Sequence, residues 1–282
     1  MATGGRPLAT ARFERFRRLE ERLRAAPASR PALEAIARDR RLGGPLLAGA
    51  LAFRLFAVLL PLALVVAVAL GYAATVDDGS TQDVGKAIGI GEATLSSVAQ
   101  SAKLDADKRW FVLAAALVAL VYAAVKAGRA VWAVHSLAWT GQAERVAHPL
   151  RVGLGLLGVV AGLGVVWGVS GLSRHELGAG GLAILLLAIV PFFGIWLLAA
   201  RALPHADAPL RALVPGALLV AVGLQVVHLG TVLVAAKQIQ RASDTYGPLG
   251  AAFTILVWLF VISRVIIASA MLGAALWQRR PR

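Results

Sequence analysis

The amino-acid sequence predicts an all-α, polytopic membrane protein with six transmembrane helices and both termini in the cytoplasm. Three observations lead to this prediction. First, 59% of the 282 residues are hydrophobic and the mean hydropathy is +0.74, which is too apolar for a soluble domain of this length. Second, six apolar stretches are each long enough to cross a bilayer core, which takes roughly 20 residues of helix. Third, the basic residues are distributed unequally between the segments that join these stretches.

The six apolar stretches contain neither Asp nor Glu, and they lack the alternation of apolar and polar residues that marks the strands of a membrane β-barrel. Because every backbone polar group must be hydrogen bonded inside lipid, each stretch is expected to form one helix. The stretches lie near residues 46–72, 110–134, 151–173, 181–203, 211–236 and 249–277.

Residues 1–45 form a basic arm before the first span. Phe13, Phe16, Leu19 and Leu23 recur at helical spacing, which predicts an amphipathic helix whose apolar face lies on the membrane surface. A solvated arm is the alternative interpretation. A second short helix is expected just before the first span, at residues 32–41.

The predicted transmembrane domain covers residues 46–277, and a basic tail follows at 278–282. The one sizeable outer segment, 76–108, is expected to hold one or two short helices on the membrane surface. The first span contains Pro61 and the fourth contains Pro191. These prolines either kink packed helices or mark matched interruptions of an inverted repeat, and the sequence leaves both interpretations open.

The third span is rich in glycine. Gly158 and Gly162, and then Gly164 and Gly168, are pairs of small residues four apart, a spacing that allows two helices to approach closely. Packing within the chain is the favoured interpretation, and a dimer face is the alternative.

The orientation prediction comes from counting Lys and Arg on each side. With cytoplasmic termini, 18 of the 29 lie inside, 7 lie outside and 4 lie within spans. The formal charge of +14 is therefore interpreted as a topology signal that also attracts anionic lipid headgroups. The basic segments carry no nucleic-acid-binding motif, so we expect lipids as partners and no nucleic acid.

The four cations inside the spans are Arg54, Lys126, Arg129 and Arg264. Insertion of such a cation at the centre of a membrane helix costs about 2.5–3.5 kcal/mol. The depth of each cation in its span therefore decides whether it needs a partner inside the membrane. Lys126 and Arg129 lie near the cytoplasmic end of the second span and can extend to the interface. Arg264 lies 13 residues from the end of its span, which is too deep for that, so it needs water, a polar partner or an anion.

An ion pair for Arg264 would require a carboxylate from a loop that folds inward, because no span holds one. Other partners are backbone carbonyls, a bound anion, or Gln225 and His228 of the fifth span, whose stripe continues to Thr231. Interhelical hydrogen bonding alone also accounts for that stripe. We predict a cationic cavity opening toward the inner leaflet, with substrate-binding residues Arg54, Lys126, Arg129, Arg264, Gln225 and His228. Cations that only hold helices at the interface are the alternative.

Enzymatic chemistry has little support in the sequence. The chain has no cysteine, and its five histidines are scattered with no carboxylate cluster at metal-ligand spacing. It also lacks a glycine-rich phosphate loop with a lysine. We therefore expect no metal, no cofactor and no enzymatic activity.

The segment YGPLGAAFTILVWLFVISRVIIASAMLGAALW contains Tyr246, Gly247, Leu249, Gly250 and Trp258, and through these residues it resembles the last span of the YihY/BrkB family of bacterial inner-membrane proteins. The resemblance covers most of the chain from about residue 40 and is most specific in the final third. Pro215 and Gly216 match the start of the family's fifth span, and Pro61 matches the proline of its first. The resemblance implies six spans and cytoplasmic termini in a bacterial plasma membrane, and it supplies no established activity. Members have been labelled as ribonuclease BN, but this sequence offers no site for that chemistry.

These observations together predict a carrier that works without ATP. The predicted substrate is an anionic lipid or amphiphile, moved in the manner of a flippase through the cationic cavity. The alternative is a structural or scaffolding membrane protein. A homo-oligomer is compatible with both.

Overall fold

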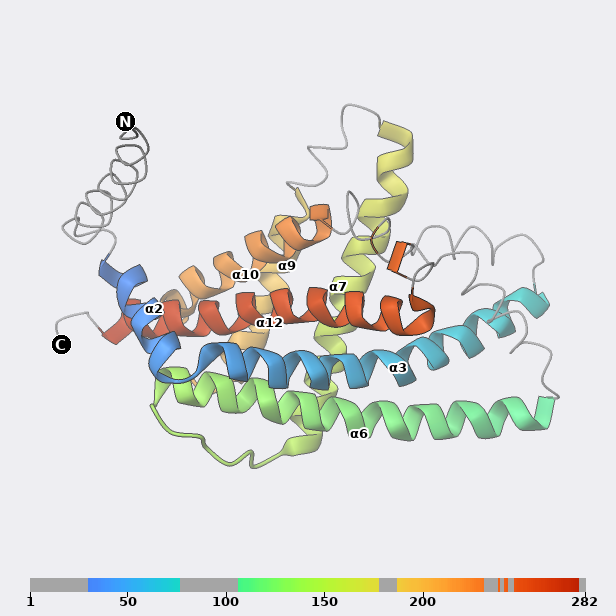
Figure 1. Cartoon of the computed structure of the whole chain (residues 1–282), viewed down its shortest axis with the longest axis horizontal. Coiled ribbons are helices and arrows are strands. Elements are labelled where there is room, and N and C mark those ends of the chain that lie inside the picture. Colours follow the sequence, from blue (N-terminus) through green and yellow to red (C-terminus); the bar gives the residue numbers. More distant parts are fainter. Residues whose placement is uncertain are drawn as a thin grey trace, which may run out of the picture.

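The protein is described by a computed structural model that covers residues 30–76, 106–177, 187–230, 238, 241–242 and 246–278. Its long elements are all α-helices, which confirms the predicted all-α class, and no strand occurs in this part of the chain (Figure 1). The helices are α2 (Arg30–Arg41), α3 (Gly44–Val76), α6 (Ala106–Trp139), α7 (Pro149–Leu177), α9 (Ile189–Ala202), α10 (Leu210–Gly230) and α12 (Pro248–Gln278).

Five of these helices, α3, α6, α7, α10 and α12, are long and apolar enough to cross a membrane. The fourth predicted span corresponds to α9, which has 14 described residues and a length of about 21 Å at 1.5 Å per residue. That is shorter than a hydrocarbon core of roughly 30 Å, and residues 181–186 of the predicted span lie outside the described part. The structure thus has five candidate spans, and a sixth remains a prediction.

Two other predictions also fall outside the described residues. They are the amphipathic helix around Phe13 and the surface helices between residues 77 and 105. The predicted short helix before the first span is present as α2.

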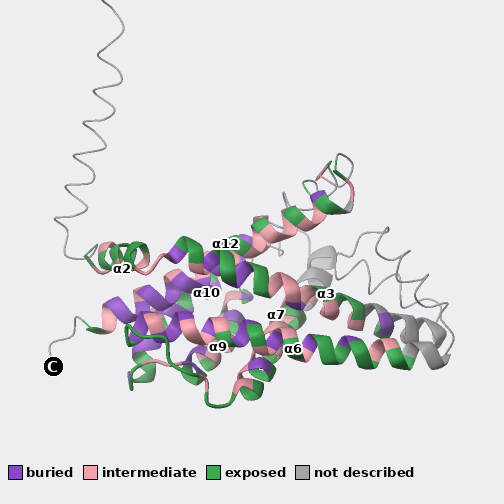
Figure 2. Cartoon of the chain, turned by 60° about the horizontal axis from the view of Figure 1, so that its bottom comes forward, coloured by how far each residue is buried: buried purple, intermediate pink, exposed green. Residues whose placement is uncertain are grey.

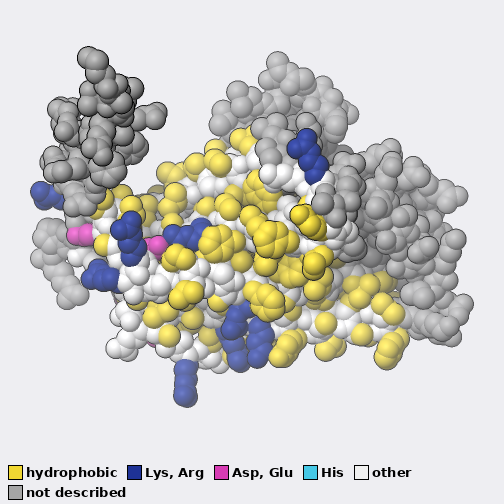
Figure 3. Space-filling model, viewed as in Figure 1, with side chains coloured by type: hydrophobic (Ala, Val, Ile, Leu, Met, Phe, Trp, Pro, Cys, Tyr) yellow, Lys and Arg dark blue, Asp and Glu magenta, His cyan; other side chains and the backbone are white. Residues whose placement is uncertain are grey.

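The outer surface of the bundle is apolar. Phe111, Leu198 and Leu249 each expose more than 70% of their surface, at 77%, 72% and 78%. Hydrophobic side chains cover much of the face in Figure 3, while Lys and Arg gather near α2 and along one edge. A monomeric soluble protein rarely exposes so large an apolar surface, whereas the hydrocarbon of a bilayer would cover it.

Helix α12 is the centre of the packing, because it contacts α10, α3, α2 and α6. The main core lies at one end of the bundle, where α2 crosses α12 (Figures 1 and 2). It includes Val134 and Trp139 of α6, Trp196 of α9, and Ile267 and Met271 of α12. At the other end α7 diverges steeply from α3 and α6 (Figure 1). In the most apolar 18-residue segment of α7, 6% of the residues are buried inside the bundle, against 50% in the corresponding segment of α10.

Helices α10 and α12 pack closely and antiparallel along three glycines spaced seven apart, at 216, 223 and 230. A Cβ atom added at Gly216 would stand 2.9 Å from the carbonyl oxygen of Ser269. At Gly223 it would stand 2.5 Å from Val265, and at the third glycine 2.7 Å from the Trp258 ring. The glycines therefore set the distance between the two helices.

The glycine pairs predicted on the third span behave differently. Around Gly158, Gly164 and Gly168, an added Cβ would meet none of the described atoms within 4 Å, and only Gly162 faces a neighbour, Ile195 of α9. The packing within the chain that the sequence favoured is therefore present at one of the four positions. The reason is that these glycines lie mainly on the outer face of α7, and a spacing of four does not by itself say which face is packed.

The two prolines do not occupy matched positions. Pro61 lies in the interior of α3, whereas Pro191 is the third residue of α9, where a helix needs no donor from the backbone nitrogen. Matched helix interruptions are therefore not present in the described helices.

Candidate functional site

Arg264 has a carboxylate partner. Its guanidinium donates two hydrogen bonds to Asp39 of α2, from Nη1 to Oδ1 at 3.0 Å and from Nη2 to Oδ2 at 2.9 Å. The side chains are 34% and 13% exposed. This bidentate geometry is the strongest that a guanidinium and a carboxylate form. The sequence admitted such a pair only if a carboxylate folded inward from outside the spans, and α2 supplies it.

Two adjacent glycines make the pair possible. Gly43 has φ +68°, a backbone conformation that favours glycine, and it turns the chain sharply between α2 and α3. At Gly44, any Cβ atom would overlap the carboxylate of Asp39. The first glycine thus directs α2 back across α12, and the second leaves the space in which Asp39 reaches Arg264.

Arg264 is less deep than its distance from the end of the apolar run indicated. Asp39 lies five residues before Gly44, so Arg264 stands near the level at which α3 begins. Helix α12 continues beyond this level, and its last residue, Gln278, donates from Nε2 to the carbonyl of Trp139 at the end of α6. The final turns of α12 therefore lie past the start of the first span.

Of the other three embedded cations, Arg54 and Lys126 lie where α3 meets α6, and Arg129 lies on the exposed surface of α6. Arg54 Nη1 of α3 donates to the backbone carbonyl of Lys126 on α6 at 3.0 Å. The Lys126 ammonium stands 5.2 Å from the ring centroid of Tyr122, one turn earlier, in a cation–π contact. Arg129 follows three residues later, and all three cationic side chains are exposed. Within the described part of the chain, no carboxylate pairs with them.

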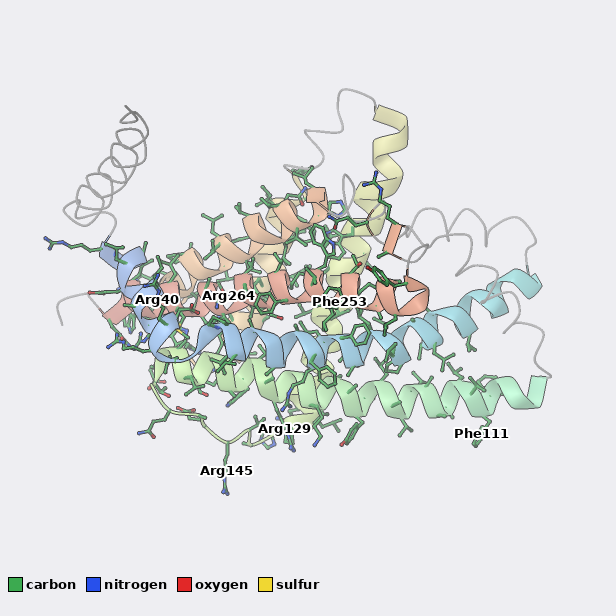
Figure 4. All side chains as sticks on the ribbon, viewed as in Figure 1. Arg40, Phe111, Arg129, Arg145, Phe253 and Arg264 are labelled. Carbon is green, nitrogen blue, oxygen red and sulfur yellow. The ribbon has the colours of Figure 1, made fainter. Side chains whose placement is uncertain are left out.

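The four cations therefore form two separate groups. Arg264 lies beside α2, whereas Arg129 lies on α6 beyond α3 (Figure 4). The described contacts do not bring Arg264 together with Arg54, Lys126 and Arg129 around one cavity. Arg54, Lys126 and Arg129 are called the seam cations below.

The polar stripe of the fifth span also lies apart from the cations. Gln225 of α10 is 5% exposed, and neither atom of its amide has a hydrogen-bond partner among the described residues. His228 stacks on Trp167 of α7, with ring centroids 5.5 Å apart and an angle of 13° between the planes. Thr231 lies outside the described residues. The stripe thus meets α7 through an aromatic contact and is not joined to Arg264.

The end of the bundle near α2 is strongly basic. Arg38, Arg40 and Arg41 occupy the last turn of α2, where positive charge is favoured by the helix dipole. Burial lowers the pKa of Arg38 and the neighbouring Arg41 lowers it further, while Glu34 opposes both. Such a cluster attracts anionic headgroups at a membrane surface.

Asp39 is the functional residue that the sequence interpretation missed. The available signal was the pair Gly43–Gly44 before the first span, four and five residues after the nearest acid, Asp39. A left-handed turn followed by a position without a Cβ can bring a preceding side chain back onto the bundle. The sequence alone does not show that Arg264 is the residue it meets.

Comparison with known proteins gives one match. A family model described as Virulence factor BrkB matches residues 35–282. No curated protein and no solved structure matches the chain.

Proposed function

This chain belongs to the virulence factor BrkB family, and from that premise we propose that it is a carrier of an anionic lipid or amphiphile that works without ATP and is not an enzyme. Membership confirms the resemblance in the sequence, and the apolar helices agree with a multi-pass membrane protein. The transported substrate and the transport itself are the proposal.

The seam cations are the observation that carries this proposal. Arg54 and Lys126 place two exposed positive charges where α3 meets α6, and Arg129 adds a third on the exposed surface of α6. No carboxylate pairs with these cations in the described residues. A charged side chain in or near lipid costs free energy, and contact with a headgroup phosphate offsets that cost. Arg54 uses one N–H for the Lys126 carbonyl and keeps other donors of its guanidinium for a phosphate.

Arg264 has a conditional role in this proposal. Asp39 occupies one edge of the guanidinium, the edge formed by Nη1 and Nη2. An anionic headgroup that binds Arg264 through this edge must therefore displace Asp39. The Asp39 carboxylate thus takes the place that the substrate's anionic group would take beside Arg264.

A structural role is the second candidate, and the same contacts favour it. Arg264 is satisfied by Asp39 and Arg54 by a carbonyl, so both side chains also fasten one helix to another. In that case the cations serve packing and no lipid moves. The carrier candidate predicts that removal of a seam cation changes the movement of lipid. The structural candidate predicts that it changes only the stability of the protein.

The test is transbilayer movement of fluorescent phosphatidylglycerol in proteoliposomes, with phosphatidylcholine as the neutral comparison. The carrier proposal predicts that wild-type protein accelerates the anionic lipid. Arg54→Gln and Lys126→Gln should each reduce this acceleration about tenfold, which corresponds to loss of one charge-assisted contact. Arg145→Gln is the matched control, because that arginine is exposed on a loop and projects away from the bundle (Figure 4). Movement no faster than in protein-free vesicles would favour the structural candidate.

The role of Arg264 needs a separate measurement. Native mass spectrometry of retained lipids should compare wild type with Asp39→Asn and Arg264→Gln. If Arg264 binds headgroups, Asp39→Asn increases retention of anionic lipid and Arg264→Gln does not. Equal retention in all three would limit Arg264 to packing.

A further inference from the structure

A groove between α6, α7 and α9 is a second site of interest, and it is built from none of the residues assigned to the carrier. We propose that it binds one acyl chain of an anionic phospholipid whose phosphate lies against His148 and Arg151. The groove has a volume of about 330 Å³, within the roughly 300–1,000 Å³ typical of ligand pockets. The inference stands whether or not the protein moves lipids.

The wall of the groove is apolar and suits a hydrocarbon chain. Val131, Trp196 and Leu203 form its buried part, and Gly155 and Ala202 lie at its exposed rim. The contact between the Trp196 and His135 rings, 6.3 Å between centroids, supports the wall from behind. A chain lying here would cover apolar side chains from three helices.

One end of the groove carries positive charge. His148 and Arg151 line it on either side of Pro149, the first residue of α7. The first backbone N–H groups of a helix lack partners inside the helix, and the helix dipole favours an anion there. Arg151 lies in the first turn of α7, so its charge and the helix terminus both favour an anion at this end of the groove.

The loop that carries this end is fixed to the bundle. Ser136 of α6 accepts a hydrogen bond from the backbone N–H of Glu144 at 3.2 Å, and Thr140 donates to the Ser136 carbonyl at 2.8 Å. His148 comes four residues after Glu144 in the chain. Helix α6 therefore both lines the groove and fixes the loop on which the headgroup would lie.

The experiment is photolabelling in vesicles with phosphatidylglycerol that carries a diazirine in one acyl chain, with labelled sites mapped by mass spectrometry. Labels should concentrate on groove residues of α6, α7 and α9. Gly155→Leu should reduce them about tenfold, because the side chain projects into open space at the rim and blocks the groove. Gly158→Leu is the matched control, since it also faces open space on α7 but does not line the groove.

The headgroup is tested in the same assay. Arg151→Gln should remove the preference for phosphatidylglycerol over labelled phosphatidylcholine, whereas Arg145→Gln should keep it. Equal labelling by the two lipids in wild type, or equal loss in Gly155→Leu and Gly158→Leu, would overturn the proposal. Displacement of the label by excess unlabelled fatty acid, but not by unlabelled phosphatidylglycerol, would also overturn it and identify a free fatty acid as the occupant.

Discussion

Arg264 is held by a carboxylate 225 positions away in the sequence. The pair is partly exposed, with Arg264 at 34% and Asp39 at 13%. Loss of one partner leaves a charge in a poorly solvated place, so it should destabilise more than loss of a surface ion pair but less than loss of a fully buried one. The main effect of the pair is expected on the docking of α2, because α2 reaches the bundle chiefly through α12.

The first prediction measures that docking. Ala35 of α2 is 8% exposed and packs in the core, and the chain has no native cysteine, so Ala35→Cys gives a single reactive thiol. Asp39→Asn or Arg264→Gln should raise its labelling rate by a water-soluble maleimide about tenfold, because local opening becomes easier. The double variant should label no faster than the more reactive single variant. Simply additive effects would mean that the two residues do not act as a pair.

The second prediction concerns Gly44. Gly44→Ala should displace the Asp39 carboxylate, because the new methyl group would occupy its position. The Ala35→Cys thiol should then react as fast as in Asp39→Asn. Gly49→Ala is the matched control on the same helix, since a Cβ there meets nothing within 4 Å. Equal reactivity in the two glycine variants would contradict the assigned contact.

At the scale of single residues, the sequence predicted that Arg264 needs a partner but did not find the partner. That Arg264 needs a partner follows from its position in the last apolar stretch and from the free-energy cost of a charge in lipid. The identity of Asp39 depends on how α2 turns at Gly43 and on where α12 ends relative to α3. Both are properties of the packed bundle.

At the scale of elements, the apolar stretches predicted the helices well because backbone groups in lipid must be paired within the helix. Their ends were predicted less well. Helix α6 runs from Ala106 to Trp139, beyond the predicted 110–134, because helix formation does not stop where the apolar run stops. The close contacts between helices were harder still. On α7 the glycine pairs mostly face outward, whereas on α10 the glycines seven apart face α12.

The third prediction tests that contact between α10 and α12. Gly223→Leu should lower the free energy of unfolding by about 1–3 kcal/mol, because the new side chain overlaps Val265. Gly164→Leu on α7 should be close to neutral, since a side chain there has open space. The measurement is thermal or detergent-induced unfolding of purified protein. A similar loss in both variants would indicate a general intolerance of glycine replacement.

At the scale of the whole molecule, the described helices form a bundle that is packed at one end and divergent at the other (Figure 1). The packed end contains α2, the end of α12, Arg145 on the loop after α6, and Arg211 in the first turn of α10. This distribution agrees with the charge count from sequence. The side of the membrane that this end faces is still a prediction.

The fourth prediction is that the packed end faces the cytoplasm. A fluorescent-protein fusion after Gln278 should be fluorescent, and an alkaline phosphatase fusion there should be inactive. An alkaline phosphatase fusion after Leu177, at the far end of α7, should be active. The opposite pattern would reverse the orientation, and phosphatase activity at both positions would mean an even number of crossings between them.

The glycines at 216, 223 and 230 also restrict how this family can diverge. At Gly216 the obstacle is the backbone of Ser269, which no substitution on α12 can remove, so this position should remain glycine among relatives. At Gly223 and Gly230 the obstacles are the side chains of Val265 and Trp258. A relative with a larger residue at either glycine should therefore carry a smaller one opposite, so these two pairs should covary while the first does not.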